Sequence, residues 1–210
     1  MAVRALFLDF DGLICDTERA ALRAWQELYA SFDLEYPDAL WVRMAGNSRG
    51  SEVALADLRV KLGRTIGPEV LAWQRGRRAQ LADLEPARPG VPELLTAAAA
   101  RGVPVSVVSS SPARWVGHHL TRLRLAGFSS VVTGEDAALH KPSPDLYRVA
   151  LRRAGVPAGE ALAVEDSVIG VRAAKAAGLA CVAVPGRPGP VAGADAVLDR
   201  LDLLDLGEWT

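Results

Sequence analysis

The chain has 210 residues, half of them hydrophobic, which is enough to bury a sizeable core and excludes a largely disordered protein. A formal net charge of −1 gives no overall positive field for nucleic acid. No apolar run approaches the roughly 18 residues of a membrane span. We therefore expect neither a nucleic-acid partner nor a membrane partner.

The cysteines and the first residues indicate a reducing compartment. Cys15 and Cys181 are the only cysteines, without a CxxC motif or a Cys/His cluster, so neither a disulfide framework nor structural zinc is expected. The N-terminal residues show no signal-peptide pattern. We expect a cytoplasmic protein that is a monomer, with a dimer as the alternative.

The first predicted element is a short buried strand, the apolar run from Ala5 to Leu8. A helix follows Asp16, with apolar residues at helical spacing. The next stretch contains no convincing strand and reads as three further amphipathic helices, interrupted near residues 46–47, 63–67 and 86. About 70 helical residues thus follow the first strand directly.

Strands and helices alternate from Pro89 onwards. One predicted helix ends at Gly102, and three more span 113–126, 144–154 and 168–177. The predicted strands are 103–109, 128–133, 161–164, 180–184 and 196–198. This alternation implies right-handed crossovers and a parallel sheet. The sequence predicts an α/β protein: a doubly wound parallel-sheet domain of residues 1–16 and 87–210, with a helical domain of residues 17–86 inserted.

Two carboxylates, Asp9 and Asp11, follow the first strand directly. The carboxyl ends of strands are where open α/β sheets bind ligands. The two side chains would repel each other unless a cation or a shared proton relieves them. Gly12 lets the backbone turn sharply and approach a ligand. Taken alone, these residues could also form an ordinary acidic turn.

Three more features lie at or after predicted strand ends. Ser109 begins the string SSSP, which suits phosphate at a helix N-terminus, although Ser111 could also simply cap that helix. Lys141 lies in HKPSPDLY, where a single lysine is often only a solvated loop charge. Glu165 and Asp166 offer the hard oxygen ligands that suit Mg²⁺, although acidic pairs at strand ends are common.

These strings, DFDG with DTE, SSS, KPSPD and VEDS, resemble in their order the motifs of the haloacid dehalogenase superfamily, in its β-phosphoglucomutase-like phosphatase group. The resemblance implies the strand order 5-4-1-2-3 and a helical cap after the first motif. It implies that Asp9 attacks phosphorus and Asp11 protonates the leaving oxygen. Lys141 and Ser109 would neutralise and bind the phosphoryl group. The implied Mg²⁺ ligands are the Asp9 side chain, the Asp11 carbonyl, Asp166, and Glu165 directly or through water.

Substrate contacts are expected from two segments. Backbone amides from Phe10 to Gly12 and at Ser110 would offset the charge of a phosphate, together with Ser109 and Lys141. The segment GNSRGSE resembles the cap loop that reads the distal part of the substrate, which makes Asn47, Ser48 and Arg49 candidates. A helix-start loop with a surface arginine is the alternative.

One departure bears on the reaction. The mutases of this group carry a histidine on the first turn of the helix after DT, and this chain has Ala21 there. A mutase must protect its phosphoenzyme from water, so the difference favours hydrolysis. We expect a Mg²⁺-dependent phosphatase of small phosphorylated metabolites, with sugar phosphates the favoured class, acting through an aspartyl-phosphate. A β-phosphoglucomutase-type phosphomutase is the alternative.

Other classes fit less well. A receiver domain would carry its acceptor aspartate on a later strand and would lack the helical insertion, and a catalytically dead binding module should have lost Asp9 or Asp11. The nucleotide motifs GxxxxGK[ST] and GxGxxG are absent.

The remaining polar and aromatic residues are expected to be structural. We place the histidines 118, 119 and 140 at the surface, tryptophans 25, 41, 73 and 115 in the core or an interface, and arginines 75, 77 and 78 on a solvated face, with substrate contact as the alternative.

Overall fold

The computed structural model describes residues 3–44, 50–186 and 191–209. The chain divides into two compact units: Met1–Asp16 with Pro86–Thr210, here called the core unit, and Thr17–Glu85, here called the helical unit. Among the described residues, no helix has the length and apolar character needed to cross a membrane.

A parallel sheet forms the centre of the core unit. Within the described residues its strands are β1 (Ala5–Leu8), β2 (Val105–Val108), β3 (Phe128–Val132), β4 (Ala161–Glu165), β5 (Ala180–Ala183) and β6 (Ala196–Val197). Their order is β3-β2-β1-β4-β5-β6, and every pairing is parallel. The predicted α/β class and strand order are confirmed, with the short β6 outside β5. The carboxyl ends of β1, β2 and β4 therefore lie side by side.

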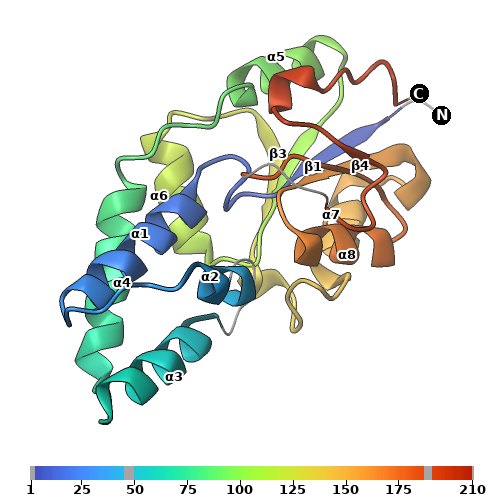
Figure 1. Ribbon diagram of the computed structural model, residues 1–210. Helices are drawn as coiled ribbons and strands as arrows, with labels where there is room; N and C mark the ends of the chain where they lie inside the picture. Colours follow the sequence, from blue (N-terminus) through green and yellow to red (C-terminus); the bar gives the residue numbers. More distant parts are fainter. Residues whose placement is uncertain (1–2, 45–49, 187–190, 210) are drawn as a thin grey trace. The chain divides into compact units, whose positions relative to one another are not determined.

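Helices cover both faces of this sheet (Figure 1). They are α5 (Val91–Ala100), α6 (Ala113–Arg122), α7 (Asp145–Ala154) and α8 (Val168–Ala176), with the 3-10 helices η1 (Gly134–Asp136), η2 (Ala158–Glu160) and η3 (Leu201–Leu203). Leu6 and Leu8 of β1 pack in one apolar layer with α5, α6 and η3. Ala5 and Phe7 pack in the other, with α7 and α8. Because side chains alternate along a strand, β1 is buried on both faces.

One predicted boundary is wrong. The helix expected to reach Ala126 ends at Arg122. Leu123 caps it, and Arg124 adopts the left-handed region at φ 54°. Glycine would normally mark such a turn, but the first glycine comes only at Gly127, so composition gave no sign of the earlier end.

The helical unit contains α1 (Thr17–Ala30), α2 (Asp38–Met44), α3 (Gly50–Leu62) and α4 (Pro68–Ala82), as the helical periodicity predicts. Its apolar core includes Trp25, Tyr29 and Leu58. The Tyr29 hydroxyl lies 2.9 Å from both the Ala54 carbonyl oxygen and Asp57 Oδ2, so these two acceptors share its one hydrogen. Burial raises the pKa of Tyr29, so this hydroxyl stays a donor that ties α1 to α3.

Candidate active site

The candidate residues of the core unit follow three neighbouring strands. Asp9 comes directly after β1, Ser109 directly after β2, and Asp166 directly after β4. The Asp9 amide donates to the Val164 carbonyl at 3.0 Å, which continues the pairing of β1 with β4. Because β1 lies between β2 and β4, these side chains share one edge of the sheet.

Lys141 connects all three of these strand ends. Its ammonium group donates to Asp9 Oδ1 and Glu165 Oε1, both at 2.6 Å, and to the Val108 carbonyl at 2.7 Å. The side chain is only 6% exposed. Burial opposes the charge, but Asp9 and Glu165 attract it and raise the pKa of Lys141. Its three hydrogens thus have acceptors on strands β1, β2 and β4 or directly after them.

The surroundings of Asp9 disfavour its negatively charged form. Burial raises the pKa of the Asp9 carboxyl to about 8; Lys141 works against this rise, whereas the charge of Glu165 adds to it. The unprotonated form, which a nucleophile needs, therefore requires more positive charge than one ammonium group supplies.

The donor set fits a divalent cation. Oxygen atoms of Asp9, Glu165 and Asp166 all lie within 4.8 Å of one another. Among the described residues, Glu165 Oε2 has no hydrogen-bond partner although it is buried. Three carboxylates facing a single lysine leave an excess of negative charge, and carboxylate oxygens are the ligands that Mg²⁺ prefers. These residues would hold a metal ion.

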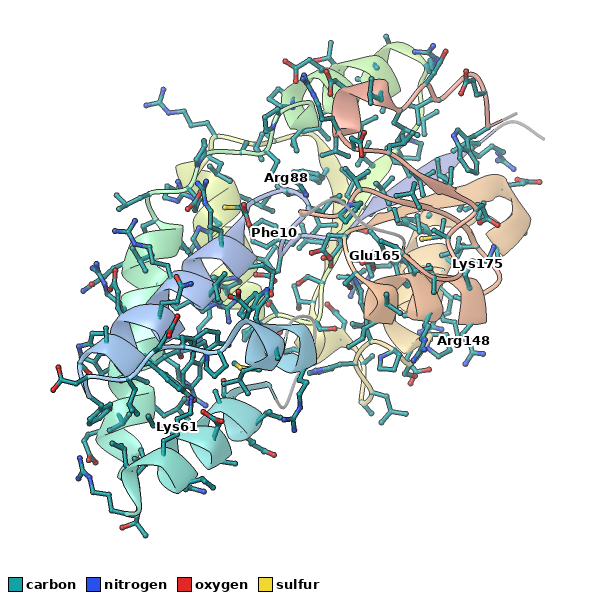
Figure 2. The ribbon with its side chains drawn as sticks, viewed as in Figure 1. Phe10, Lys61, Arg88, Arg148, Glu165 and Lys175 are labelled. Atoms are coloured by element: carbon teal, nitrogen blue, oxygen red, sulfur yellow. The ribbon has the colours of Figure 1, made fainter. Side chains whose placement is uncertain are left out.

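Two residues that hold Glu165 were not identified from the sequence. The Tyr147 hydroxyl, on the inner face of α7, donates to Glu165 Oε1, so this oxygen is shared with Lys141. On α8, a Cβ at Gly170 would lie only 1.8 Å from Glu165 Oε2, so the carboxylate occupies space that only glycine leaves (Glu165 is labelled in Figure 2). Tyr147 ends the string KPSPDLY, which was the available signal for it.

The Asp11 carboxylate accepts hydrogen bonds from three side chains of the segment after β2. Ser109 Oγ lies 3.3 Å and Ser111 Oγ 2.6 Å from Oδ2, and Trp115 Nε1 lies 2.9 Å from Oδ1. Sequence reasoning treated Trp115 only as a core or interface residue. The alternative that Ser111 caps the helix is wrong: the N-cap of α6 is Pro112, without a side-chain cap.

The capping role passes to another segment. The Ala113 amide at the start of α6 donates to the Glu135 carboxylate, at 2.9 and 3.2 Å to its two oxygens. Since Glu135 satisfies this amide, the Ser111 hydroxyl is available to Asp11. Ser109 Oγ also accepts from the Ser111 amide at 3.0 Å, which fixes its orientation.

The backbone makes the sharp turn expected at Gly12, while phosphate binding there stays a prediction. Gly12 has φ 85°, a left-handed conformation that favours glycine, and its amide donates to the Cys15 carbonyl at 2.8 Å. Its carbonyl accepts from the Arg88 guanidinium (labelled in Figure 2). Ser110 Oγ accepts from the Lys141 amide at 3.3 Å. Asn47, Ser48 and Arg49 lie outside the described residues.

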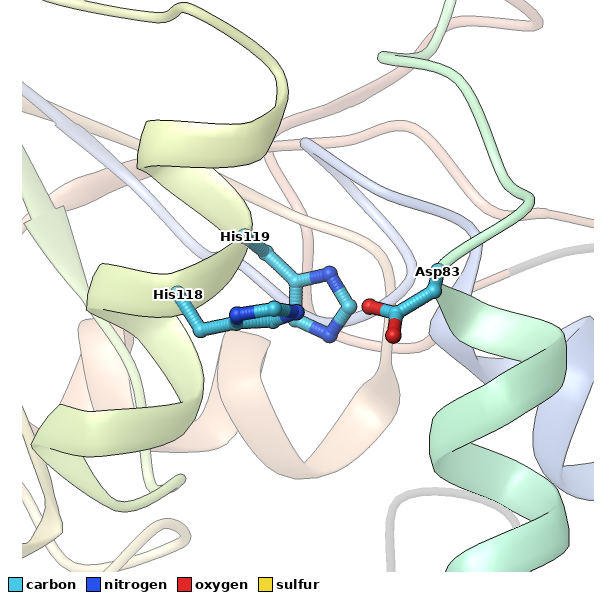
Figure 3. Close-up of side chains that lie close together, drawn as sticks. All are labelled: Asp83, His118 and His119. Carbon is cyan, nitrogen blue, oxygen red and sulfur yellow. The ribbon is translucent and has the colours of Figure 1, made fainter.

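His118 and His119 are neighbours on α6 (Figure 3), and they differ in exposure. His118 is exposed as predicted, but the same prediction for His119 is wrong, because this side chain is fully buried. Its ring lies 4.4 Å from the Trp115 ring and 6.0 Å from the Phe10 ring, between centroids. The helical spacing from Val116 to His119 could have placed it on the inner face. His140 is exposed as predicted, and its Nε2 lies 3.0 Å from the Gly134 carbonyl oxygen.

Comparison with known proteins shows which family has this arrangement of residues. A family model described as haloacid dehalogenase-like hydrolase matches residues 3–178, which include the carboxyl ends of β1, β2 and β4. The chain belongs to this hydrolase family. The expected family resemblance is thereby confirmed.

Three relatives illustrate its range. A Bacillus subtilis protein provisionally named phosphatase YhcW is 37% identical over 88% of this chain and 84% of its own length. A crystal structure of a CbbY variant from Rhodobacter sphaeroides, in complex with xylulose 1,5-bisphosphate, is 28% identical, with a TM-score of 0.71 and 96% of each chain covered. A Thermotoga maritima structure provisionally named β-phosphoglucomutase is 26% identical, with a TM-score of 0.79 and 96% and 95% of the two chains covered.

Proposed function

We propose that this protein is a Mg²⁺-dependent phosphatase that hydrolyses small phosphorylated metabolites, with sugar phosphates as the favoured class. The observation that carries the proposal is the buried Lys141 ammonium, 2.6 Å from both Asp9 and Glu165. A phosphate dianion repels a carboxylate nucleophile, so such a reaction needs concentrated positive charge at this point. A bound Mg²⁺ would add positive charge beside the transferring phosphoryl group.

In the first half-reaction, an Asp9 oxygen forms a bond to phosphorus while the bond from phosphorus to the ester oxygen breaks. Asp11 gives its proton to the leaving oxygen, which departs as an alcohol. Lys141 and backbone amides at Phe10, Asp11 and Ser110 would balance the charge on the phosphoryl oxygens, because the Gly12 amide already donates to the Cys15 carbonyl. The product of this step is an aspartyl-phosphate on Asp9.

In the second half-reaction, Asp11 takes a proton from a water molecule, which attacks the phosphoryl group. The bond between Asp9 and phosphorus breaks, inorganic phosphate leaves, and both carboxyl groups return to their starting states. Ser109 is suited to hold a phosphoryl oxygen because its hydroxyl lies beside Asp11.

The substrate class rests on relatives. CbbY was crystallised with xylulose 1,5-bisphosphate, and YhcW carries a phosphatase name. We propose a substrate of the same kind, a small sugar or polyol phosphate. The cap residues Asn47, Ser48 and Arg49 remain predictions for contacts to its distal part. Cytoplasmic location and a monomeric state likewise remain predictions from the sequence.

A phosphomutase of the β-phosphoglucomutase type is the second candidate, because a Thermotoga maritima structure with that provisional name has a TM-score of 0.79 to this chain. Ala21 argues against it. The mutase pattern has a histidine at this position, and α1 has a buried alanine.

We also propose that the helical unit is a cap that closes over the substrate. Both connections to it are tied down on the core side: Cys15 forms an antiparallel bridge with Ala87, and the Arg88 amide donates to the Ile14 carbonyl at 2.9 Å. A hinge motion would then be confined to the junctions beyond these contacts. Small-angle scattering with and without a phosphate analogue should differ; an unchanged profile would contradict a moving cap.

The direct test is a screen of phosphorylated metabolites by phosphate release, with p-nitrophenyl phosphate as the general substrate. Turnover should disappear in EDTA and return with excess Mg²⁺. Undiminished turnover in the chelator would overturn the metal requirement, and no phosphate release from any compound with Mg²⁺ present would overturn the phosphatase proposal.

A further inference from the structure

Asp11 has partners of two chemical kinds on its two oxygens. Oδ1 accepts from the Trp115 indole N–H at 2.9 Å, and Oδ2 accepts from the Ser111 hydroxyl at 2.6 Å. Ser109 adds a longer contact to Oδ2 at 3.3 Å. The carboxylate is therefore held at both ends, and its plane is fixed by partners on one short segment.

We propose that Trp115 is a positioning residue for proton transfer by Asp11: it fixes Oδ1 and leaves Oδ2 to exchange the proton. The inference deepens the proposed phosphatase function and rests on it. An indole N–H can only donate a hydrogen bond, whereas a serine hydroxyl can donate or accept. When Asp11 carries a proton on Oδ2, the Ser111 hydroxyl can turn and accept it, but the indole cannot.

Packing holds the indole in place. Trp115 lies in the first turn of α6, and its amide donates to the Pro112 carbonyl at 2.9 Å. Its ring meets the buried His119 ring edge-on, at 4.4 Å between centroids and 75° between planes. His119 in turn packs against Phe10, at 6.0 Å. Phe10 lies between Asp9 and Asp11 in the chain, so one aromatic row joins Trp115 to the catalytic loop.

His119 is itself anchored. The Arg122 Nε donates to His119 Nδ1 at 3.3 Å, which holds the imidazole from the side of the helix end. The ring that packs against the indole, His119, is therefore buried and held by its own hydrogen bond. A misplaced carboxylate slows proton transfer even when its chemistry is intact, so a rigid donor at Oδ1 has a direct use.

The kinetic test compares two leaving groups. Nitrophenolate needs little protonation, whereas an alkoxide needs a proton to leave. Trp115→Phe keeps an aromatic ring at this position and removes the N–H together with the five-membered ring of the indole. We expect kcat for glucose 6-phosphate to fall by about 10- to 100-fold and kcat for p-nitrophenyl phosphate by less than about threefold, with both KM values unchanged. Trp73 of the helical unit is exposed, so the prediction that placed it in the core or an interface is wrong, and Trp73→Phe is a matched control that should behave as wild type.

Ser111 gives a second, independent variant pair. Ser111→Ala should show the same selective loss, and Ser111→Thr, which keeps the hydroxyl, should restore alkyl phosphate turnover to within about threefold of wild type. If Trp115→Phe does not fold, the spectra of wild type and Asp11→Ala below decide: one indole signal other than that of Trp73, which Trp73→Phe assigns, should move, and no moved signal would overturn the inference. Equal losses on both substrates, or no loss on either, would overturn the inference.

An NMR measurement that does not depend on turnover tests this inference separately from the proposed function. The chain has five tryptophans, so ¹⁵N-labelled protein should give five indole N–H signals, assigned by Trp115→Phe and Trp73→Phe. In Asp11→Ala the Trp115 signal should move upfield, while that of Trp73 stays. An unmoved Trp115 signal would contradict the contact even in an active enzyme. If the wild type released no phosphate, the phosphatase proposal would be refuted. The indole N–H spectrum would still test the hydrogen bond between Trp115 and Asp11.

Discussion

The active-site cluster of the core unit and the ion pairs of the helical unit differ in how deeply their charges are buried. In the core unit, Lys141, Asp9 and Glu165 are buried, with side-chain exposures of 6%, 10% and 0%. In the helical unit, the pairs stay near the surface: Lys61 with Asp57 and Arg77 with Glu27 have exposures near 30% on each side. The same residue types thus occur in two very different dielectric settings.

This difference in burial indicates that the buried charges serve the reaction and that neither set of charges contributes much to stability. Burying charges costs several kcal/mol for each ion, and the cost is recovered only with good geometry, so a buried cluster is weak evidence for stabilisation. Surface pairs contribute about 0–1 kcal/mol. The helical unit is held by apolar packing around Trp25, Tyr29 and Leu58. Removing a charge from the buried cluster of the core unit should therefore lower turnover, whereas removing a surface charge from the helical unit should change almost nothing.

The largest expected effect comes from Asp9→Asn, which removes the nucleophile while keeping the shape of the side chain. Turnover should fall by about 10⁵-fold or more, because no covalent intermediate can form. The circular dichroism spectrum should match that of wild type. Asp57→Asn in the helical unit is the control and should keep full turnover. A rate within tenfold of wild type for Asp9→Asn would exclude its nucleophilic role.

Next is the pair of lysine variants that compares the units directly. Lys141→Met leaves Asp9 and Glu165 buried without their cation and should destabilise the protein by about 3 kcal/mol while lowering turnover by several decades. Lys61→Met removes an exposed partner and should change stability by less than about 0.5 kcal/mol. Urea unfolding and phosphate release measure both. Similar stability losses for the two variants would show that burial does not distinguish the units.

Sequence patterns captured the scaffold because it depends on local periodicity. Apolar runs indicated the strands, and parallel strands bring their carboxyl ends to one edge, so Asp9, Ser109 and Glu165 could be grouped without coordinates. Lys141 could be added only through the family resemblance, because its reach to Asp9 depends on the loop before α7.

The supporting residues were not identified because their partners are set by packing. Tyr147 looks like an ordinary apolar position of α7, yet its hydroxyl bonds to Glu165, 18 residues later. Trp115 looks like a core residue, yet it bonds to Asp11, 104 residues earlier. Nothing local in a sequence encodes such pairs, since they appear only when α6 and α7 pack on the sheet.

The smallest expected effect concerns Asp195, far from the chemistry. Burial opposes its charge, but hydrogen bonds from Lys175 and the Cys181 amide outweigh this and lower the pKa of Asp195 (Lys175 is labelled in Figure 2). Because the folded pKa lies below the usual value near 3.9, the contribution is complete above about pH 4 and is lost as the pH falls through the folded pKa. Since both side chains are more than one third exposed, we expect about 0.5 kcal/mol.

Asp195→Asn keeps an oxygen acceptor for the Cys181 amide and removes the charge. Denaturant unfolding of both proteins from pH 7 downwards should show a small deficit of the variant that shrinks below pH 4. A deficit that grows on acidification would contradict the sign.

The most direct test of the central claim, hydrolysis at Asp9, sets the two candidate reactions against each other. The enzyme is incubated with β-glucose 1-phosphate and glucose 1,6-bisphosphate in Mg²⁺, and free phosphate and glucose 6-phosphate are followed together. With Ala21 in place of the mutase histidine, we predict that phosphate release exceeds isomer formation and needs no bisphosphate. Isomer formation that outruns phosphate release by about tenfold, a barrier difference of about 1.4 kcal/mol, would contradict it.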